Sequence, residues 1–357
     1  MKKSVMMLCG MAVFALLLFI SCGQNEDAPD TVRDVNILML ANMLGDMGYN
    51  DGIVWELRAV EERFRAEPYV NMSVSVYEVT VGSGDERERI EQAFQNDSDL
   101  VFAINHATLP FLEPAAAFFP DKRFVLLDME AIGPNIMSAL FKPNEAAFLC
   151  GALAALMSET GVIGIVLGAD IPVLHDFAVG FIDGAVMVRP DIQVIVSITG
   201  NFGDAALAYE IAVGQFERGV DVIFGATGGA SHGVIQAAAN HGHYVIGVDL
   251  DQTRHVSPEL ARSIITSCLK NFDVLIPLLI DEFLDGSLTF GNTRRFGIQD
   301  GAVGIARNEI YFDLVPPSIQ LEIDALEAKL VSGEIQVRSA LEMTRAQVDA
   351  LFDSVRP

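Results

Sequence analysis

The most regular feature of the chain is an alternation of short apolar runs with segments of helical spacing. Apolar runs without polar interruption are typical of parallel strands that are covered by helices on both faces. The pattern therefore predicts an α/β fold with two doubly wound, parallel-sheet domains. The expected strands are 36–40, 70–77, 100–104, 123–127, 162–167, 192–198, 220–224, 244–248 and 293–298, and the expected helices are 51–65, 86–95, 145–158, 172–188, 205–218, 233–240, 272–284 and 318–331.

The N-terminal segment has the pattern of a bacterial lipoprotein signal peptide. Lys2 and Lys3 precede an apolar run over 5–20, which ends at a small residue, Ser21, directly before Cys22. We expect residues 1–21 to be the signal peptide, Cys22 to be acylated, and 22–33 to be a polar tether. Stable anchoring needs more than one acyl chain. The protein is then expected at the cell membrane, facing the periplasm or the exterior; an uncleaved signal anchor is the alternative.

Composition narrows the class of partner. The chain has 357 residues, 51% of them hydrophobic, and a formal charge of −25. A field of this sign repels phosphate backbones and anionic ligands, so nucleic acid is not expected as a partner, whereas neutral or cationic small ligands remain open. Cys150 and Cys268 lie in apolar segments and are expected to be buried and unpaired.

Ligands of open parallel sheets bind beyond the carboxyl ends of the strands, so the loops that follow the strands are the candidate site. These loops contain Asp, Asn, His, aromatic residues and Gly, without a cysteine cluster or an acidic metal cage. Neither a G-x-G-x-x-G fingerprint nor a Walker A loop is present, so no nucleotide cofactor and no metal are expected. The candidate ligand-binding residues are Asp46, Tyr49, Asn50, His106, Phe177, Phe202, Gly228, Asp249 and Lys270.

Each residue type suggests a contact. The carboxylate of Asp249 can accept hydrogen bonds from neighbouring hydroxyls of a ligand. Tyr49 and Phe202 follow strands in otherwise polar loops, and their rings could stack on a flat ligand. Lys270 ends an apolar run, where a solvated surface lysine would be unusual, and it could donate to a polyol in the cleft; a surface lysine with an extended stem is the alternative. Asp249 and Asp251 could also serve as paired acids of a hydrolase.

Several motifs together resemble the basic membrane protein family of lipoproteins, which includes the purine nucleoside receptor A substrate-binding proteins of ABC transporters. The resemblance covers residues 36–338. It rests on the segments 45–56, 144–151, 171–181, 219–223, 246–252, 266–270 and 330–335, which occur in this order with compatible spacing.

The resemblance implies a type I periplasmic-binding-protein fold, two domains joined by a three-stranded hinge, and a purine nucleoside in the cleft. The expected division is 34–138 plus 251–288 for the N-terminal domain and 139–250 plus 289–357 for the C-terminal domain.

By resemblance, Asp46 and Asn50 match the family, and Tyr49 stands where the family has Phe. Asp249 matches the acid expected to bind ribose, and Lys270 matches a lysine of the cleft. Phe177 and Phe202 lie where the second domain could supply an aromatic face. The chain departs from the family at Asn105 and His106 and over 203–207, which affects the base preference.

The combined interpretation is a lipid-anchored, monomeric, non-enzymatic substrate-binding protein that delivers purine nucleosides to an ABC permease with its ATPase. No cofactor is implied. The alternatives are a sugar or autoinducer receptor of the same fold, a nucleoside hydrolase, and a sensor or surface antigen without a transporter.

Overall fold

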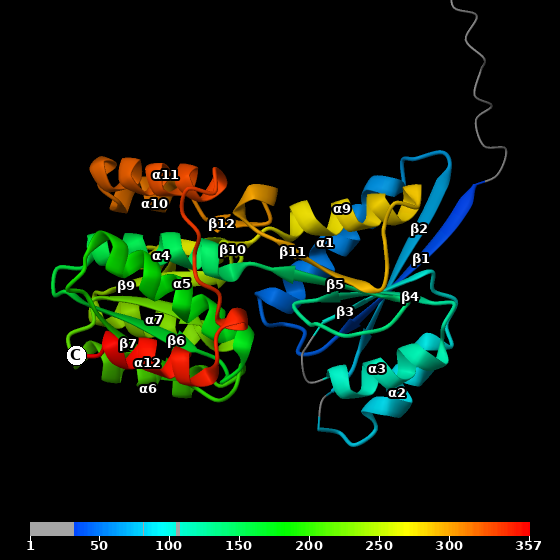
Figure 1. Ribbon diagram of the computed structural model, residues 1–357, viewed down its shortest axis with the longest axis horizontal. Coiled ribbons are helices and arrows are strands. Elements are labelled where there is room, and N and C mark those ends of the chain that lie inside the picture. The colour runs from blue at the N-terminus through cyan, green and yellow to red at the C-terminus, as the bar shows by residue number, and fades with distance from the viewer. Residues whose placement is uncertain (1–31, 81, 105–107) are drawn as a thin grey trace, which may run out of the picture.

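The computed structural model describes residues 32–80, 82–104 and 108–357, and it contains two α/β lobes that lie side by side (Figure 1). The first lobe has a six-stranded sheet in the order β11-β5-β4-β3-β1-β2, and the second has a six-stranded sheet in the order β12-β10-β9-β8-β6-β7. The two sheets correspond strand by strand, so both have the same doubly wound order. In each lobe the strand order changes direction next to the first strand, between β1 and β3 in one sheet and between β6 and β8 in the other. Sheets of this kind bind ligands at that point.

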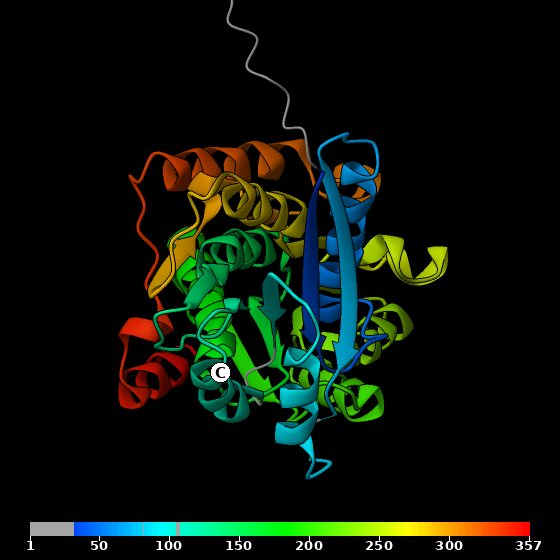
Figure 2. The same cartoon turned by 90° about the vertical axis from the view of Figure 1, so that its right-hand side faces the viewer.

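All strand pairs of the first lobe are parallel, and Figure 2 shows the two long strands β1 and β2 side by side. Alternate residues of β1 enter two different cores: Ile37 and Met39 share a cluster with Ile53, whereas Leu38 and Leu40 lie in another cluster. Burial on both faces explains the uninterrupted apolar run. The elements are β1 (Arg33–Ala41), α1 (Tyr49–Phe64), β2 (Val70–Glu78), α2 (Glu86–Phe94), β3 (Leu100–Ala103), α3 (Leu109–Phe118), β4 (Arg123–Leu127), β5 (Ile136–Phe141), α9 (Phe272–Asp285) and β11 (Asn292–Phe296).

The second lobe is parallel except for β12, which runs antiparallel to β10. Its elements are α4 (Pro143–Met157), β6 (Val162–Leu167), α5 (Pro172–Val188), β7 (Gln193–Ile198), α6 (Ala205–Phe216), β8 (Val222–Ala226), η2 (Gly228–Ala230), α7 (Ser231–His241), β9 (Tyr244–Asp249), η3 (Gln252–Arg254), α8 (Pro258–Ala261), β10 (Ile264–Lys270), η4 (Ile298–Asp300), β12 (Val303–Ile305), α10 (Glu309–Leu314), α11 (Pro317–Val331), η5 (Ala340–Glu342) and α12 (Arg345–Ser354). The helices α10 and α11 lie over the α4 side of this lobe (Figure 1).

The observed connections differ from the expected division of the chain. The segment 251–288 was expected in the N-terminal domain, yet β10 pairs with β9 and β12 in the second sheet. The segment 289–357 was expected in the C-terminal domain, yet β11 pairs with β5 in the first sheet. The expected boundary between residues 138 and 139 falls inside the strand β5. A strand joins the sheet that offers it a hydrogen-bonding edge, and local sequence does not specify that edge.

Three segments connect the lobes. They run from β5 to α4, from β10 to α9, and from β11 to β12 through η4. Each is short, so the lobes are joined along one line with a cleft beside it. No helix among the described residues has both the length and the apolar character needed to cross a membrane.

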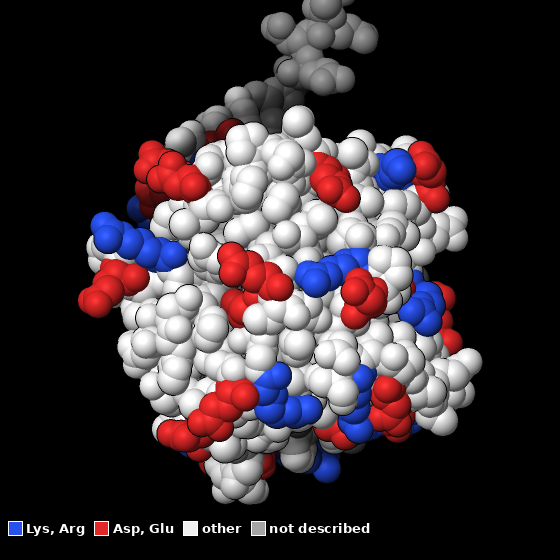
Figure 3. Space-filling model, turned by 90° about the vertical axis from the view of Figure 1, so that its left-hand side faces the viewer, with Lys and Arg blue, Asp and Glu red and all other residues white. Residues whose placement is uncertain are grey.

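Surface charges are dispersed on the face of the second lobe that Figure 3 shows. Carboxylates and basic side chains alternate there, separated by wide neutral areas. The face therefore carries no continuous strip of one sign.

Candidate ligand-binding site

A cavity of about 150 Å³ lies between the lobes, beyond the carboxyl ends of the strands of both sheets. This is roughly ten times the volume that holds one water molecule, so the cavity accommodates a small organic ligand or part of one. The cavity lining contains the expected residues Asp46, Tyr49, Asn50, Phe177, Phe202, Gly228, Asp249 and Lys270. His106 lies outside the described residues, and its role at the site stays a prediction.

The centre of the polar part of the cavity is Lys270, at the end of β10. Its Nζ lies 2.5 Å from Oδ2 of Asp128 and 3.5 Å from Oδ1 of Asp249. All three side chains are at least nine-tenths buried. The solvated surface lysine is therefore the wrong reading, because Lys270 forms a buried charge cluster with two carboxylates.

Asp128 and Asp249 occupy equivalent positions in the two lobes. Asp128 follows β4, and Asp249 ends β9. Both have left-handed backbone geometry, with φ of 54° and 63°. Aspartate tolerates this region better than most residues, but it still costs free energy, and such strain concentrates at functional sites. The two bends direct both carboxylates to the same lysine.

Burial and charge set the protonation of this cluster. Burial raises the pKa of Asp249 to about 6, although Lys270 lowers it, and the carboxylates of Asp46 and Asp128 raise it further. Burial alone would lower the pKa of Lys270, but the two carboxylates outweigh burial and raise it above its ordinary value. Lys270 is therefore charged at neutral pH. This one positive charge faces two carboxylates, so the cluster has a net negative charge.

One oxygen of the Asp249 carboxylate has no hydrogen-bond partner among the described residues. Oδ1 of Asp249 is buried and makes no hydrogen bond to any described residue. Oδ1 lies 3.5 Å from Nζ of Lys270, which is close enough for an ion pair but too far for a strong hydrogen bond. A buried, charged acceptor in this condition is costly unless a donor reaches it, so the site favours a ligand with hydroxyl or amine hydrogens.

The Tyr49 ring is held by two contacts, one of which covers a face of the ring. Nζ of Lys270 lies over its ring, 4.5 Å from the centroid. The ring of Phe272 packs edge-on at 5.6 Å. These contacts hold the ring in the wall of the cavity, and its stacking on a ligand stays a prediction.

Phe202 lines the cavity, and its stacking on a ligand stays a prediction. Its ring rests against the backbone at two glycines: a Cβ on Gly168 would lie 2.5 Å from the ring, and one on Gly228 would lie 3.2 Å from it. Gly228 also has a φ of +58°, which favours glycine. The absence of side chains at these two positions lets the ring lie flat against the loops of β6 and β8, inside the cavity lining.

Asp46 and Asn50 organise the loop that precedes α1. The carboxylate of Asp46 accepts hydrogen bonds from the backbone N–H groups of Gly48, Asn50 and Asp51, and from Nδ2 of Asn50 at 2.7 Å. Both oxygens are thus engaged within the loop. Their direct contact with a ligand stays a prediction, and these hydrogen bonds give both residues a structural role in the loop.

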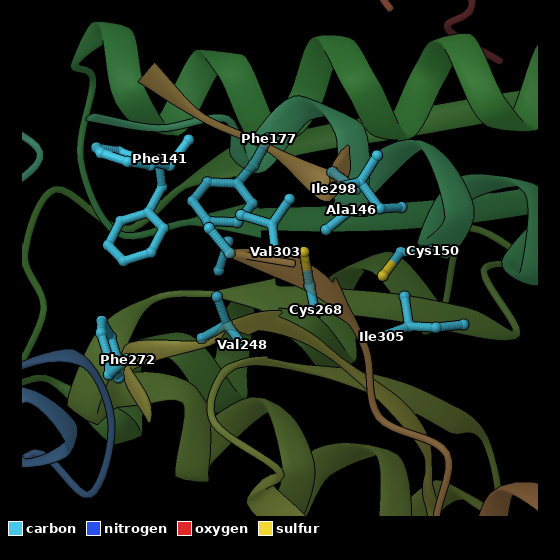
Figure 4. Close-up of a cluster of buried hydrophobic side chains, with 14 of the residues drawn as sticks. Phe141, Ala146, Cys150, Phe177, Val248, Cys268, Phe272, Ile298, Val303 and Ile305 are labelled. Carbon is cyan, nitrogen blue, oxygen red and sulfur yellow. The ribbon is translucent and has the colours of Figure 1, made fainter. Parts of the chain in front are cut away.

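Phe177 belongs largely to the core of the second lobe. It is 1% exposed and packs against Phe224 at 5.9 Å. Figure 4 shows its ring between Phe141 and the side chains of the sheet, above Val248. Cys150 and Cys268 are both buried and form no disulfide within the described part of the chain, as expected.

Asp128 is the main residue that sequence reasoning missed. The strand 123–127 is among the expected strands, but Asp128, which directly follows it, is not among the candidate ligand-binding residues. The signal was present, because an aspartate directly after an apolar strand occupies the same position as Asp249 after β9. Apolar residues complete the lining: Met43, Leu127, Met129, Ile171, Val173, Leu174, Ala226 and Val248.

Asp251 does not line the cavity. Its carboxylate accepts hydrogen bonds from Thr253 Oγ1 at 2.6 Å and from Asn308 Nδ2 at 2.9 Å. Asp249 and Asp251 are thus not a pair of acids facing one substrate. Among the described residues, no three His, Cys, Asp or Glu side chains gather as a metal site would require.

The lobes meet at the mouth of the cavity. A Cβ on Gly203 would lie 3.5 Å from Cε of Met43, and a Cβ on Gly229 would lie 3.5 Å from Cα of Asp46. Further along α1, the ring of Trp55 stacks on His255 of the second lobe at 5.1 Å. The structure is therefore that of a closed cleft.

Comparison with solved structures supports the fold. An ABC transporter solute-binding protein from Aeropyrum pernix K1 matches with a TM-score of 0.75 and 24% identity, over 90% of this chain and 97% of that chain. A second, from Conexibacter woesei DSM 14684, matches with a TM-score of 0.67 and 20% identity, over 86% of this chain and 99% of that chain. The expected type I periplasmic-binding-protein fold is confirmed.

Sequence comparison gives the family. The chain is 27% identical to Basic membrane protein A of Borreliella burgdorferi (strain B31), over 91% of this chain and 94% of the relative. It is 29% identical to Basic membrane protein D of Borreliella burgdorferi (strain JD1), over 83% and 85%. The family described as "ABC transporter substrate-binding protein PnrA-like" matches residues 36–340. The chain therefore belongs to the family of PnrA-like ABC transporter substrate-binding proteins.

Proposed function

We propose that this protein binds a nucleoside, with a purine base as the expected class, between its two lobes. The observation that carries the proposal is one cavity that combines the Phe202 ring with the unpaired, buried carboxylate oxygen of Asp249. A nucleoside has the complementary parts, because its base offers a flat aromatic face and its ribose offers vicinal hydroxyls. Stacking of a base on an aromatic ring contributes about 1–3 kcal/mol.

The charge of the cavity supports a neutral ligand. Asp46, Asp128 and Asp249 line it together with one cation, Lys270. A phosphate group would be repelled by this excess of carboxylates and would find Lys270 already bound to Asp128. Nucleosides are therefore preferred over nucleotides.

The experiment is a calorimetric panel on the purified mature chain, with adenosine, guanosine, inosine, adenosine monophosphate, ribose and allose. We expect binding of at least one purine nucleoside and at least tenfold weaker binding of the monophosphate. Mass spectrometry of ligand released from the freshly purified protein identifies what the cavity holds. Tight binding of a free sugar without nucleoside binding would overturn the proposal in favour of a sugar receptor.

Asp249→Ala is the matched variant for the ribose contact. A hydrogen bond to a charged group contributes about 1.5–3 kcal/mol, so the variant should bind the nucleoside at least tenfold more weakly. Incubation of the protein with inosine, followed by analysis for free hypoxanthine, separates binding from hydrolysis. Product formation at a catalytic rate would contradict the non-enzymatic interpretation.

We further propose delivery of the bound nucleoside to an ABC permease from a lipid anchor at Cys22. Family membership supports the transporter, and the sequence before Cys22 supports the anchor and an extracytoplasmic location. Metabolic labelling with a fatty acid tests the anchor. Cys22→Ser should abolish the label and release the protein from membranes, or leave an unprocessed precursor, and undiminished label in this variant would exclude Cys22 as the modified residue.

A further inference from the structure

A second polar atom in the cavity also has no partner. The hydroxyl oxygen of Tyr49 is buried and makes no hydrogen bond to any residue that the structure describes. The Asp128 carboxylate lies close to it, but the two do not form a hydrogen bond of acceptable geometry. A buried hydroxyl left in this state costs free energy, which a ligand with a suitable group would recover.

The hydroxyl cannot easily turn to a partner elsewhere. The Tyr49 ring is fixed by Lys270 on one face and by the edge contact with Phe272. Rotation of the ring about its own axis leaves the hydroxyl oxygen in place. The oxygen is therefore held in one place, on a side chain that lines the cavity.

The surroundings decide which group the hydroxyl can bind. Burial raises the pKa of Tyr49 well above its ordinary value, and the neighbouring carboxylates of Asp128 and Asp249 raise it further, so the hydroxyl keeps its proton. A ligand atom that only accepts, such as a carbonyl oxygen, would gain this donor but would be repelled by the same carboxylates. A hydroxyl accepts from Tyr49 and also donates to a carboxylate, so it satisfies both requirements.

We propose that Tyr49 is a specificity-determining residue whose hydroxyl donates a hydrogen bond to one sugar hydroxyl of the nucleoside. This inference rests on the proposed function and extends it. Phe202 then supplies the stacking surface, and the cluster of Tyr49, Asp128, Asp249 and Lys270 recognises the sugar.

The test compares the wild type with Tyr49→Phe, using adenosine and its 2′-, 3′- and 5′-deoxy analogues as probes in calorimetry. We expect Tyr49→Phe to weaken adenosine binding about 3- to 10-fold, the range for one neutral hydrogen bond. One of the three analogues should bind wild type and variant within about twofold of each other, because it lacks the hydroxyl that Tyr49 contacts. That analogue identifies the hydroxyl.

Tyr311→Phe is the matched control. Tyr311 is 0% exposed, its hydroxyl also makes no hydrogen bond within the described part of the chain, and it does not line the cavity. This variant should bind all four probes as the wild type does. Thermal unfolding establishes that both variants are folded. Should Tyr49→Phe fail to fold, 19F NMR of wild-type protein containing 3-fluorotyrosine provides the second readout, because the Tyr49 signal should respond differently to adenosine and to one analogue.

The outcomes separate a failure of this inference from a failure of the proposed function. Unchanged adenosine affinity in folded Tyr49→Phe would overturn this inference and leave the proposed function standing. An equal loss for adenosine and all three analogues would also overturn it, because the partner of Tyr49 would then lie outside the sugar. Wild-type protein that binds none of the nucleosides would overturn the proposed function and this inference together.

Discussion

Nζ of Lys270 lies 2.5 Å from Oδ2 of Asp128, so an ion pair joins the end of β10 in the second lobe to the loop after β4 in the first. The two residues are 142 positions apart in the chain. Their side chains are 6% and 10% exposed. This contact links the lobes beside one of the three connecting segments, and Asp249 completes it from the second lobe.

Removing the cation should strongly destabilise the protein. Lys270→Met leaves Asp128 and Asp249 buried without their counter-ion, and breaking a buried pair in this way costs about 3–5 kcal/mol. Urea unfolding measures the loss as a lower midpoint. Arg87→Met is the control, since the pair of Arg87 with Glu91 is solvent-exposed and contributes little. Equal midpoints for the wild type and Lys270→Met would contradict the importance of this pair.

Space behind the Phe202 ring should be essential for binding. Gly168→Ala places a Cβ 2.5 Å from the ring carbons, so the ring must move into the cavity. We expect nucleoside affinity to fall by up to the value of one base stack, about 1–3 kcal/mol. Gly214→Ala in α6 is the matched control, because its Cβ would meet nothing within 4 Å. Wild-type affinity in folded Gly168→Ala would exclude Phe202 as the stacking surface.

Trp55 should report closure of the cleft. It is the only tryptophan in the chain, it is 43% exposed, and its ring stacks on His255 of the opposite lobe at an interplanar angle of 27°. Hinge opening would alter this contact, so nucleoside should change the tryptophan emission in a saturable titration.

His255→Ala should remove most of that signal and weaken nucleoside binding by no more than an aromatic pair contributes, about 0.5–1.5 kcal/mol. His243→Ala serves as the control, because His243 packs against Phe216 within the second lobe. A ligand-dependent change of emission that survives in His255→Ala at full size would show that the stack does not report closure.

Nucleoside affinity should fall as the pH is lowered through about 6. The pKa of Asp249 is raised by burial to about 6, and only its carboxylate form accepts hydrogen bonds from two hydroxyls. Ligand binding favours the charged form, so calorimetry near pH 6 in two buffers of different ionisation enthalpy should detect proton release.

The free energy of unfolding should rise, whereas affinity falls, as the pH is lowered through about 6. A carboxyl whose folded-state pKa is raised destabilises the fold when it is ionised, and this penalty disappears as the pH falls through about 6 toward the unfolded-state pKa.

Asp176 provides the control: burial raises its pKa to about 6 as well, but it accepts hydrogen bonds from Ser339 and Ala340 outside the cavity. Asp249→Asn should flatten the pH profiles of both stability and affinity, and Asp176→Asn only that of stability. Affinity independent of pH in the wild type would contradict the assignment to Asp249.

The sequence by itself determined the α/β class and the edge of the sheets at which the cavity lies. These features are local: an apolar run buried on both faces must be covered by helices, and the loop after each strand is fixed by chain direction. For this reason Asp46, Phe202, Gly228 and Asp249 could be placed at one cavity from their positions after expected strands.

Only the tertiary structure decided how the chain divides between the lobes and what each side chain does in the cavity. The strands β10 and β11 joined the opposite sheets to those expected, because each paired with an edge formed by distant residues. Tyr49 became a wall residue with an unpaired hydroxyl, because Lys270 and Phe272 pack against it. Such contacts depend on where side chains meet in space, and spacing along the chain carries no information about them.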